Sequence, residues 1–218
     1  DMFPGPVGQS VTGRAFEKGV WNYTATNIRD YAADKHKTVD DVPFGGGAGM
    51  VMKPDVVEAA LLALPATGCK IYLSPRGKVL TQALAQELSN EPVLTLLCGR
   101  YEGVDQRVLD AHGFEEISIG DYVLTGGELA AYVLMDSIIR LLPDGVGNPA
   151  TPDEESFTNG LLEYPHYTRP AEWIDTQGTQ RNVPDVLTSG HHANVAKWRH
   201  EQSLALTRER RPDLIKSK

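Results

Sequence analysis

The chain has 218 residues, of which 41% are hydrophobic and 23% charged, as in a globular protein with one large domain or one large and one small domain. Its formal net charge of −8 argues against a protein that coats nucleic acid through bulk charge, although a local basic patch is compatible with RNA binding. No apolar stretch approaches the roughly 18–20 residues of a membrane span, and no signal peptide is visible. We therefore expect a cytoplasmic protein without membrane association.

The first part of the chain alternates short apolar runs with helical periodicity. Pro54 and Asp55 mark the start of a helix whose apolar face includes Val56, Ala60 and Leu64. Strands are expected over residues 69–73, 93–98 and 116–119, and helices over 54–65, 79–88, 102–112 and 126–142. This alternation predicts an α/β domain over residues 1–143 with a mainly parallel, buried sheet.

The rest of the chain has a different composition. Residues 144–193 are rich in Pro, Gly, Thr and Asn and are expected to form a long connection, either functional or disordered. From Ala193 onward the pattern is helical again, with basic residues among the apolar ones. We expect a small helical domain over residues 194–218, whose basic residues either bind RNA or form a solvated helix face.

The two cysteines, Cys69 and Cys98, lie at the end of or inside apolar runs. Neither belongs to a Cys-x-x-Cys or Cys/His pattern, so we expect buried, reduced thiols and no structural zinc site.

Glycine-bearing turns follow three successive predicted strands, at residues 74–77, 99–103 and 120–128. The carboxyl ends of parallel strands share one edge of a sheet, where ligands bind, and glycine lets a ligand approach the backbone. The glycine run 45–49 lacks the spacing of a dinucleotide motif, and Gly77-Lys78 lacks the rest of a Walker A motif. The turns therefore favour a ligand held by backbone groups, such as an adenosyl-sulfonium, over a dinucleotide or ATP.

Five segments occur in an order that resembles the bacterial tRNA (guanine-N1) methyltransferase family, the TrmD family. They are residues 38–41 (TVDD), 42–50 (VPFGGGAGM), 97–103 (LCGRYEG), 118–129 (SIGDYVLTGGEL) and 165–170 (PHYTRP). The resemblance covers nearly the whole chain. It implies a SPOUT-type α/β fold with a mainly parallel sheet tied in a deep trefoil knot, plus a small helical C-terminal domain that binds tRNA. It also implies S-adenosyl-methionine (SAM) as methyl donor, a requirement for Mg²⁺, and homodimers in which each active site uses both chains.

By position in these motifs, the resemblance places SAM against the three glycine turns. The expected contact residues are Tyr72, Leu73, Ser74, Gly99, Tyr101, Glu102, Gly103, Ile119, Gly120, Asp121, Tyr122, Val123, Leu124, Gly126 and Gly127.

The chemistry of the reaction suggests two further roles. N1 of guanine carries a proton at neutral pH, and negative charge builds on O6 as that proton leaves, so a general base and a cation are needed. The resemblance assigns the base to Glu155, directly before Ser156, with Asp153 and Glu154 as alternatives. It assigns the cation to Arg140, which would otherwise complement the dipole at a helix C-terminus.

The remaining expectations concern the substrate. Asp40 and Gly49 match positions near the target guanosine, while Arg169, Lys197 and Arg199 are expected to contact tRNA phosphates. The pair His191-His192 does not by itself define a metal site, and no metal ligands are assigned.

The sequence departs from the family pattern in several places. Ala48 and Ala130 stand where relatives have proline, and residues 174–182 form a longer segment than usual. An N-terminal core strand is expected before Asp1, outside this sequence, as is the end of the C-terminal domain.

Two other functions stay open at this point. Another SPOUT enzyme, methylating a ribose 2′-hydroxyl or a different base, would keep the SAM turns without needing Glu155 and Arg140 together. A non-catalytic relative would bind RNA without transferring a methyl group.

Overall fold

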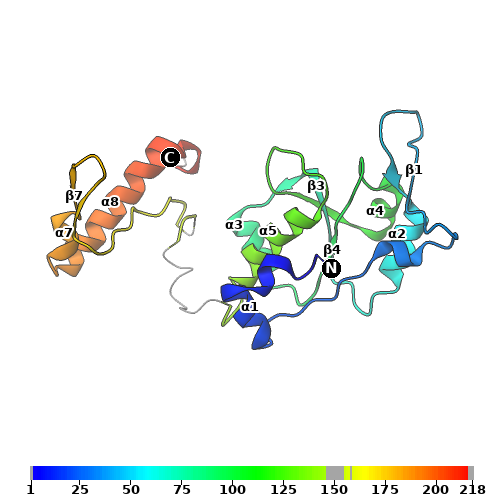
Figure 1. Cartoon of the computed structure of the whole chain (residues 1–218), viewed down its shortest axis with the longest axis horizontal. Helices are drawn as coiled ribbons and strands as arrows, with labels where there is room; N and C mark the ends of the chain where they lie inside the picture. The colour runs from blue at the N-terminus through cyan, green and yellow to red at the C-terminus, as the bar shows by residue number, and fades with distance from the viewer. Residues whose placement is uncertain (1, 146–154, 158, 216–218) are drawn as a thin grey trace. The chain divides into compact units, whose positions relative to one another are not determined.

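A computed structural model of the protein describes residues 2–145, 155–157 and 159–215 (Figure 1). The chain divides into two compact units, residues 1–149 and 150–218, each of which is described by itself. Within the described residues, no helix has both the length and the apolar character needed to cross a membrane.

The first unit is built on a three-stranded parallel sheet. Its strand order is β4 (Leu94–Leu97), β3 (Cys69–Val79) and β5 (Glu115–Ser118), with β3 in the middle. Ile71 of β3 pairs with Leu96 on one side and with Glu115 on the other. The predicted α/β domain with a mainly parallel sheet is therefore confirmed.

Helices cover both faces of this sheet, which lies between α3 and α5 on one side and α2 and α4 on the other (Figure 1). Side chains alternate along a strand, so Ile71 and Leu73 face α3 (Gln82–Leu88) and α5 (Glu128–Ile139), where Leu134 is fully buried. Tyr72 faces the opposite side, where α2 (Pro54–Leu62) and α4 (Gln106–His112) contribute Val57 and Leu109.

The middle strand differs from its prediction. The sequence predicts a strand that ends at Leu73 and a helix that starts at Val79, but β3 runs to Val79, with a bulge at residues 74–77 where its register against β5 shifts. The strand continues because Leu80 N–H donates a hydrogen bond to the Ser118 carbonyl at 2.7 Å. Helix α3 starts only at Gln82, since the Thr81 hydroxyl accepts from Leu84 N–H and caps the first turn.

The N-terminal segment packs against the end of α5. It contains η1 (Gly5–Gly8) and α1 (Ser10–Glu17), and Val7, Ala15 and Trp21 form a small core with Ile139. A further short turn, η2 (Ile28–Tyr31), follows.

An antiparallel hairpin connects this segment to α2. Its strands are β1 (Asp40–Asp41) and β2 (Val51–Met52), and the glycine-rich run lies between them. Met52 N–H donates to the Gly103 carbonyl at 2.9 Å and the Met52 carbonyl accepts from Asp105 N–H at 3.1 Å. The hairpin is thus joined to the second glycine turn. The Asp105 side chain caps α4 at Arg107 N–H, which is why this helix starts later than the predicted residue 102.

The second unit contains more regular structure than predicted. Residues 144–193 were expected to form a connection, yet they include β6 (Glu172–Ile174), β7 (Gln180–Asn182) and α7 (Asp185–Thr188). The Asp175 carboxylate accepts from the N–H groups of Gln177 and Thr179 at 2.9 Å each, which closes the turn between the two strands. The predicted C-terminal helix is present as α8 (His192–Arg210), followed by η3 (Pro212–Leu214).

Candidate cofactor and substrate site

The three glycine turns surround one cavity, which we call the donor cavity. All the residues expected to contact SAM line it, except Asp121, which is exposed in the third turn. The sequence reasoning missed six lining residues: Pro75, Arg100, Ile117, Ser118, Thr125 and Ala130. Pro75, Arg100 and Thr125 lie inside the turns already singled out, so their neighbours were the available signal. Ile117 and Ser118 belong to β5, and Ala130 lies in the first turn of α5.

The glycines in these turns are required by close approach. A Cβ on Gly127 would lie 2.8 Å from the Cys98 Cα, and one on Gly99 would lie 2.9 Å from the Tyr72 ring. Gly103 and Gly120 have φ values of +132° and +143°, which side-chain-bearing residues rarely adopt. Gly127 N–H also donates to the Gly99 carbonyl at 2.9 Å, so the second and third turns hold each other.

An ion pair reinforces this contact between the second and third turns. Arg100 Nε donates to Glu128 Oε1 at 2.9 Å, and the Glu128 side chain is only 16% exposed. Glu128 is the first residue of α5 and its charge also suits the helix N-terminus. The cavity wall formed by these two turns is therefore fixed by side chains as well as by backbone.

Tyr72 forms part of the cavity floor between the first and second turns. Its side chain is 5% exposed, and burial raises the pKa of the phenol above its ordinary value. Tyr72 is consequently neutral at physiological pH and contributes an apolar ring with one polar tip.

Cys98 lies just before the second turn and is expected to be chemically inert. Burial raises the pKa of its thiol to about 12, with a further contribution from the nearby Glu128 carboxylate, so the reactive thiolate is absent at neutral pH. Iodoacetamide at pH 7.5 should leave Cys98 unmodified in the folded protein and modify it after unfolding, as measured by peptide mass spectrometry. Labelling of the native protein as fast as that of the unfolded chain would contradict this half-buried, neutral state.

The glycine-rich hairpin touches the second turn at Gly49. A Cβ on Gly49 would lie 2.4 Å from the Glu102 side chain, and Glu102 N–H donates to the Met50 carbonyl at 2.9 Å. Asp40 lies at the other end of the hairpin, half-buried and paired with Met52. The two residues predicted near the guanosine thus belong to a single hairpin that contacts the donor cavity at Glu102.

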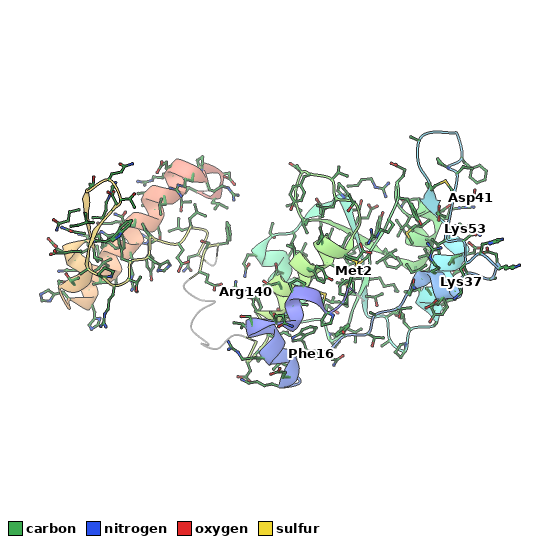
Figure 2. All side chains as sticks on the ribbon, in the orientation of Figure 1. Met2, Phe16, Lys37, Asp41, Lys53 and Arg140 are labelled. Carbon is green, nitrogen blue, oxygen red and sulfur yellow. The ribbon has the colours of Figure 1, made fainter. Side chains whose placement is uncertain are left out.

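Arg140 lies at the C-terminal end of α5, as labelled in Figure 2, and is half-buried. Its N–H donates to the Asp136 carbonyl at 3.2 Å, so its backbone position is fixed by the last turn of the helix. The Arg140 backbone is therefore held by the helix whose first turn borders the donor cavity.

Glu155 belongs to the second unit, where it immediately precedes a closed turn. Glu163 N–H donates to the Ser156 hydroxyl at 3.0 Å, and Phe157 N–H donates to the Leu161 carbonyl at 2.8 Å. The turn is anchored to α8 because Leu162 N–H donates to the hydroxyl of fully buried Thr207 at 2.8 Å. Glu155 is half-buried, whereas Asp153 and Glu154 lie outside the described residues.

The predicted phosphate contacts of the second unit differ in their surroundings. Arg169 is exposed, and the Lys197 side chain is 76% exposed with its Nζ 3.9 Å from a Glu201 oxygen. The Arg199 guanidinium instead lies 4.7 Å from the centre of the Tyr164 ring and is half-buried. Arg199 therefore packs within the unit, while Arg169 and Lys197 are accessible to a ligand.

No group of three or more His, Cys, Asp or Glu side chains that could hold a metal ion occurs among the residues the structure describes. His166 Nε2 lies 2.9 Å from a Glu163 oxygen, and its ring packs against that of Tyr164.

The fold and the cavity define the chain as an α/β protein with a cavity at the carboxyl edge of a parallel sheet, lined by three glycine turns. Its sequence identifies the family within that class. The chain belongs to the family of tRNA (guanine-1)-methyltransferases, TrmD, whose model matches residues 1–217. Its α/β fold is accordingly of the SPOUT type.

This chain is similar to curated tRNA (guanine-N(1)-)-methyltransferases and covers most of the length of each. A tRNA (guanine-N(1)-)-methyltransferase from Rhodospirillum rubrum is 61% identical over 215 residues, covering 98% of this chain and 88% of the relative. Proteins of that name from Mesorhizobium japonicum and Ruegeria pomeroyi are 56% and 53% identical, covering 99% and 97% of this chain and 92% and 87% of the relatives.

Proposed function

We propose that the protein transfers a methyl group from SAM to N1 of the guanosine directly 3′ of the tRNA anticodon, and that it does so in the cytoplasm. The observation that carries this proposal is a family match over residues 1–217 in a chain whose three glycine turns surround one cavity. Neither a lone cavity nor a lone motif would support so specific a reaction.

The donor cavity suits SAM because glycine turns lie beside apolar and aromatic side chains such as Tyr72, Leu124 and Ile119. A Cβ at Gly99 would meet the Tyr72 ring and one at Gly127 would meet Cys98, so these glycines let the turns pack closely around the cavity. Among the residues lining the cavity, the one Lys or Arg is Arg100, which is paired with Glu128, so the lining offers no cluster of cations for a phosphate. When bound, SAM supplies a methyl group on a sulfonium that a nucleophile displaces.

The proposal includes a homodimer with composite active sites, which the small size of the cavity leaves room for. Its volume is about 190 Å³, below the roughly 300–1,000 Å³ of sites that enclose drug-sized ligands. A SAM molecule in it would keep an open side, where a second copy of the chain and the tRNA complete the site. A trefoil knot through the three turns is part of the same proposal.

The chain's own residues supply the proton transfer and the charge stabilisation. Glu155 removes the N1 proton, and its neighbour Ser156 starts a turn anchored to α8, which restricts where the carboxylate can reach. Arg140 neutralises the charge that develops on O6, from a backbone position fixed by α5. A positioned base contributes about 10²–10⁴-fold in rate.

The tRNA is expected to contact both units. Asp40 and Gly49 approach the target guanosine on the hairpin that touches the donor cavity. Arg169 and Lys197, with the basic residues of α8, bind the phosphate backbone as a C-terminal tRNA-binding domain. Arg199 contributes to this surface through packing on Tyr164.

Mg²⁺ has no assigned place in this proposal. Among the described residues, no three or more His, Cys, Asp or Glu side chains come together in a group that could hold it.

A methylation assay with paired transcripts tests the function. Purified protein, Mg²⁺ and methyl-labelled SAM are mixed with tRNA transcripts carrying guanosine or adenosine directly after the anticodon. Label on the guanosine transcript alone is expected. Label on both transcripts would indicate a different SPOUT methyltransferase, and RNA binding without label would indicate a non-catalytic relative.

A further inference from the structure

The first glycine turn is a loop that bulges out of a continuous strand. Leu73 and Lys78 both pair with Ile117 of β5, so residues 74–77 leave the sheet and return to it at the same level. Gly77 lies against β5 so closely that a Cβ would be 2.3 Å from the Glu116 carbonyl carbon. The loop is therefore pressed onto β5 at Glu116.

Arg76 adds a side-chain connection at the same place. Its Nη2 lies 3.1 Å from both carboxylate oxygens of Glu116 and 3.1 Å from Oε1 of Gln106 on α4. Glu116 Oε2 is buried and accepts no hydrogen bond of good geometry within the described residues, so the adjacent guanidinium is the charge that compensates it. At the other end of the loop, Arg76 N–H donates to the Ser74 hydroxyl at 3.2 Å.

Arg76 itself does not line the donor cavity, whereas Ser74 and Pro75 beside it do. Ser74 is 7% exposed, so its position is sensitive to where the loop backbone lies. Any effect of Arg76 on the cavity must therefore pass through these two neighbours.

We infer that Arg76, through its pairing with Glu116 and Gln106, is a positioning residue that holds the 74–77 loop as a wall of the donor cavity and so sets the affinity for the methyl donor. The inference rests on the proposed function for the identity of that donor. Without this attachment, the loop would become ordered only when the ligand binds. The entropy lost in ordering the loop would then lower the affinity for the ligand.

The solvent exposure of Arg76 and Glu116 distinguishes a role in shaping the cavity from a role in stabilising the fold. The Arg76 side chain is 62% exposed and that of Glu116 is 24% exposed. Ion pairs this accessible to solvent contribute little to folding. Arg76→Gln alone leaves the buried Glu116 oxygen without its compensating charge. The double variant Arg76→Gln/Glu116→Gln removes both charges, so loss of the pair in this variant should appear in SAM binding and leave the melting temperature nearly unchanged.

Arg76→Gln in the full chain tests the inference. The Kd for SAM, measured by titration calorimetry, and the KM for SAM are expected to rise about threefold to tenfold, the cost of ordering one loop on binding. The kcat at saturating SAM and the KM for tRNA should stay as in the wild type. The double variant Arg76→Gln/Glu116→Gln should be no weaker than the more affected single variant, because both changes remove the same interaction.

Lys78→Gln is the matched control. Lys78 Nζ lies 3.3 Å from Glu115, so this pair links the same two strands, but neither residue lines the donor cavity. Unchanged SAM affinity in Arg76→Gln, or an equal loss in Lys78→Gln, would overturn the inference. A wild-type chain that failed to bind SAM would instead overturn the proposed function.

Discussion

Glu155→Gln is expected to lower the kcat for methyl transfer by about 10²–10⁴-fold, because an amide of the same size cannot accept the N1 proton. The Kd for SAM should stay within about twofold of the wild-type value, since no role in donor binding is assigned to this side chain. Single-turnover methylation of the guanosine transcript measures the first quantity, and calorimetric titration with SAM measures the second. A lower kcat with an unchanged Kd for SAM identifies Glu155 as the general base, whereas a higher Kd would identify it as a contact of the methyl donor.

Glu163→Gln provides the control for this experiment. Glu163 lies on the same anchored turn, where its N–H donates to the Ser156 hydroxyl and its carboxylate contacts His166. Because the backbone N–H remains in this variant, the turn should persist and turnover should change little. Undiminished turnover in Glu155→Gln would exclude Glu155 as the base, and the same substitution at Asp153 and Glu154 would then identify the residue responsible.

The site within the first unit was largely predictable because it is local in sequence. The second and third glycine turns directly follow parallel strands, which brings them to one edge of the sheet. The first leaves β3 level with Ile117, close to the end of β5. Tyr72, Gly99 and Gly120 therefore meet at the donor cavity as the order of elements requires. The resemblance added which ligand to expect there, which spacing alone could not provide.

Contacts between distant segments were less predictable. The sequence contains Arg76 and Glu116 as two ordinary charged residues, forty positions apart, and only the paired strands bring them together. Likewise, the basic helix predicts a phosphate contact for Arg199, but nothing in the sequence indicates that its guanidinium packs over Tyr164. Helical periodicity places a residue on a face and does not show what packs against that face.

The long β3 strand illustrates a different limit. Ser74-Pro75-Arg76-Gly77 has the composition of a terminating turn, so the strand was expected to end there. It resumes because the N–H of Leu80 finds a carbonyl acceptor on β5, a tertiary contact that overrides the local turn signal. The hairpin at 172–182 was missed for the opposite reason, since its strands are short and polar and the closing Asp175 turn is its main signal.

Gly127→Ala is expected to weaken SAM binding roughly 10- to 100-fold, the range that overpacking by one methyl group implies. Gly127 has φ −76°, so alanine is conformationally allowed and the effect comes from contact alone. The new Cβ would lie 2.8 Å from the Cys98 Cα and 3.0 Å from the Gly99 nitrogen, both of them backbone atoms that cannot rotate away. The second and third turns must separate, which disturbs the wall of the donor cavity that they share. Titration calorimetry with SAM measures the loss.

Gly113→Ala distinguishes this effect from ordinary loss of stability. Gly113 ends α4 at φ +64° with no atom within 4 Å of a built Cβ, so alanine there introduces backbone strain without a clash. Its melting temperature should fall by about 2–4 °C while the Kd for SAM is retained. If Gly127→Ala bound SAM as tightly as Gly113→Ala, the contact between the two turns would not shape the donor cavity, and the methyl donor would have to be held by other parts of the chain.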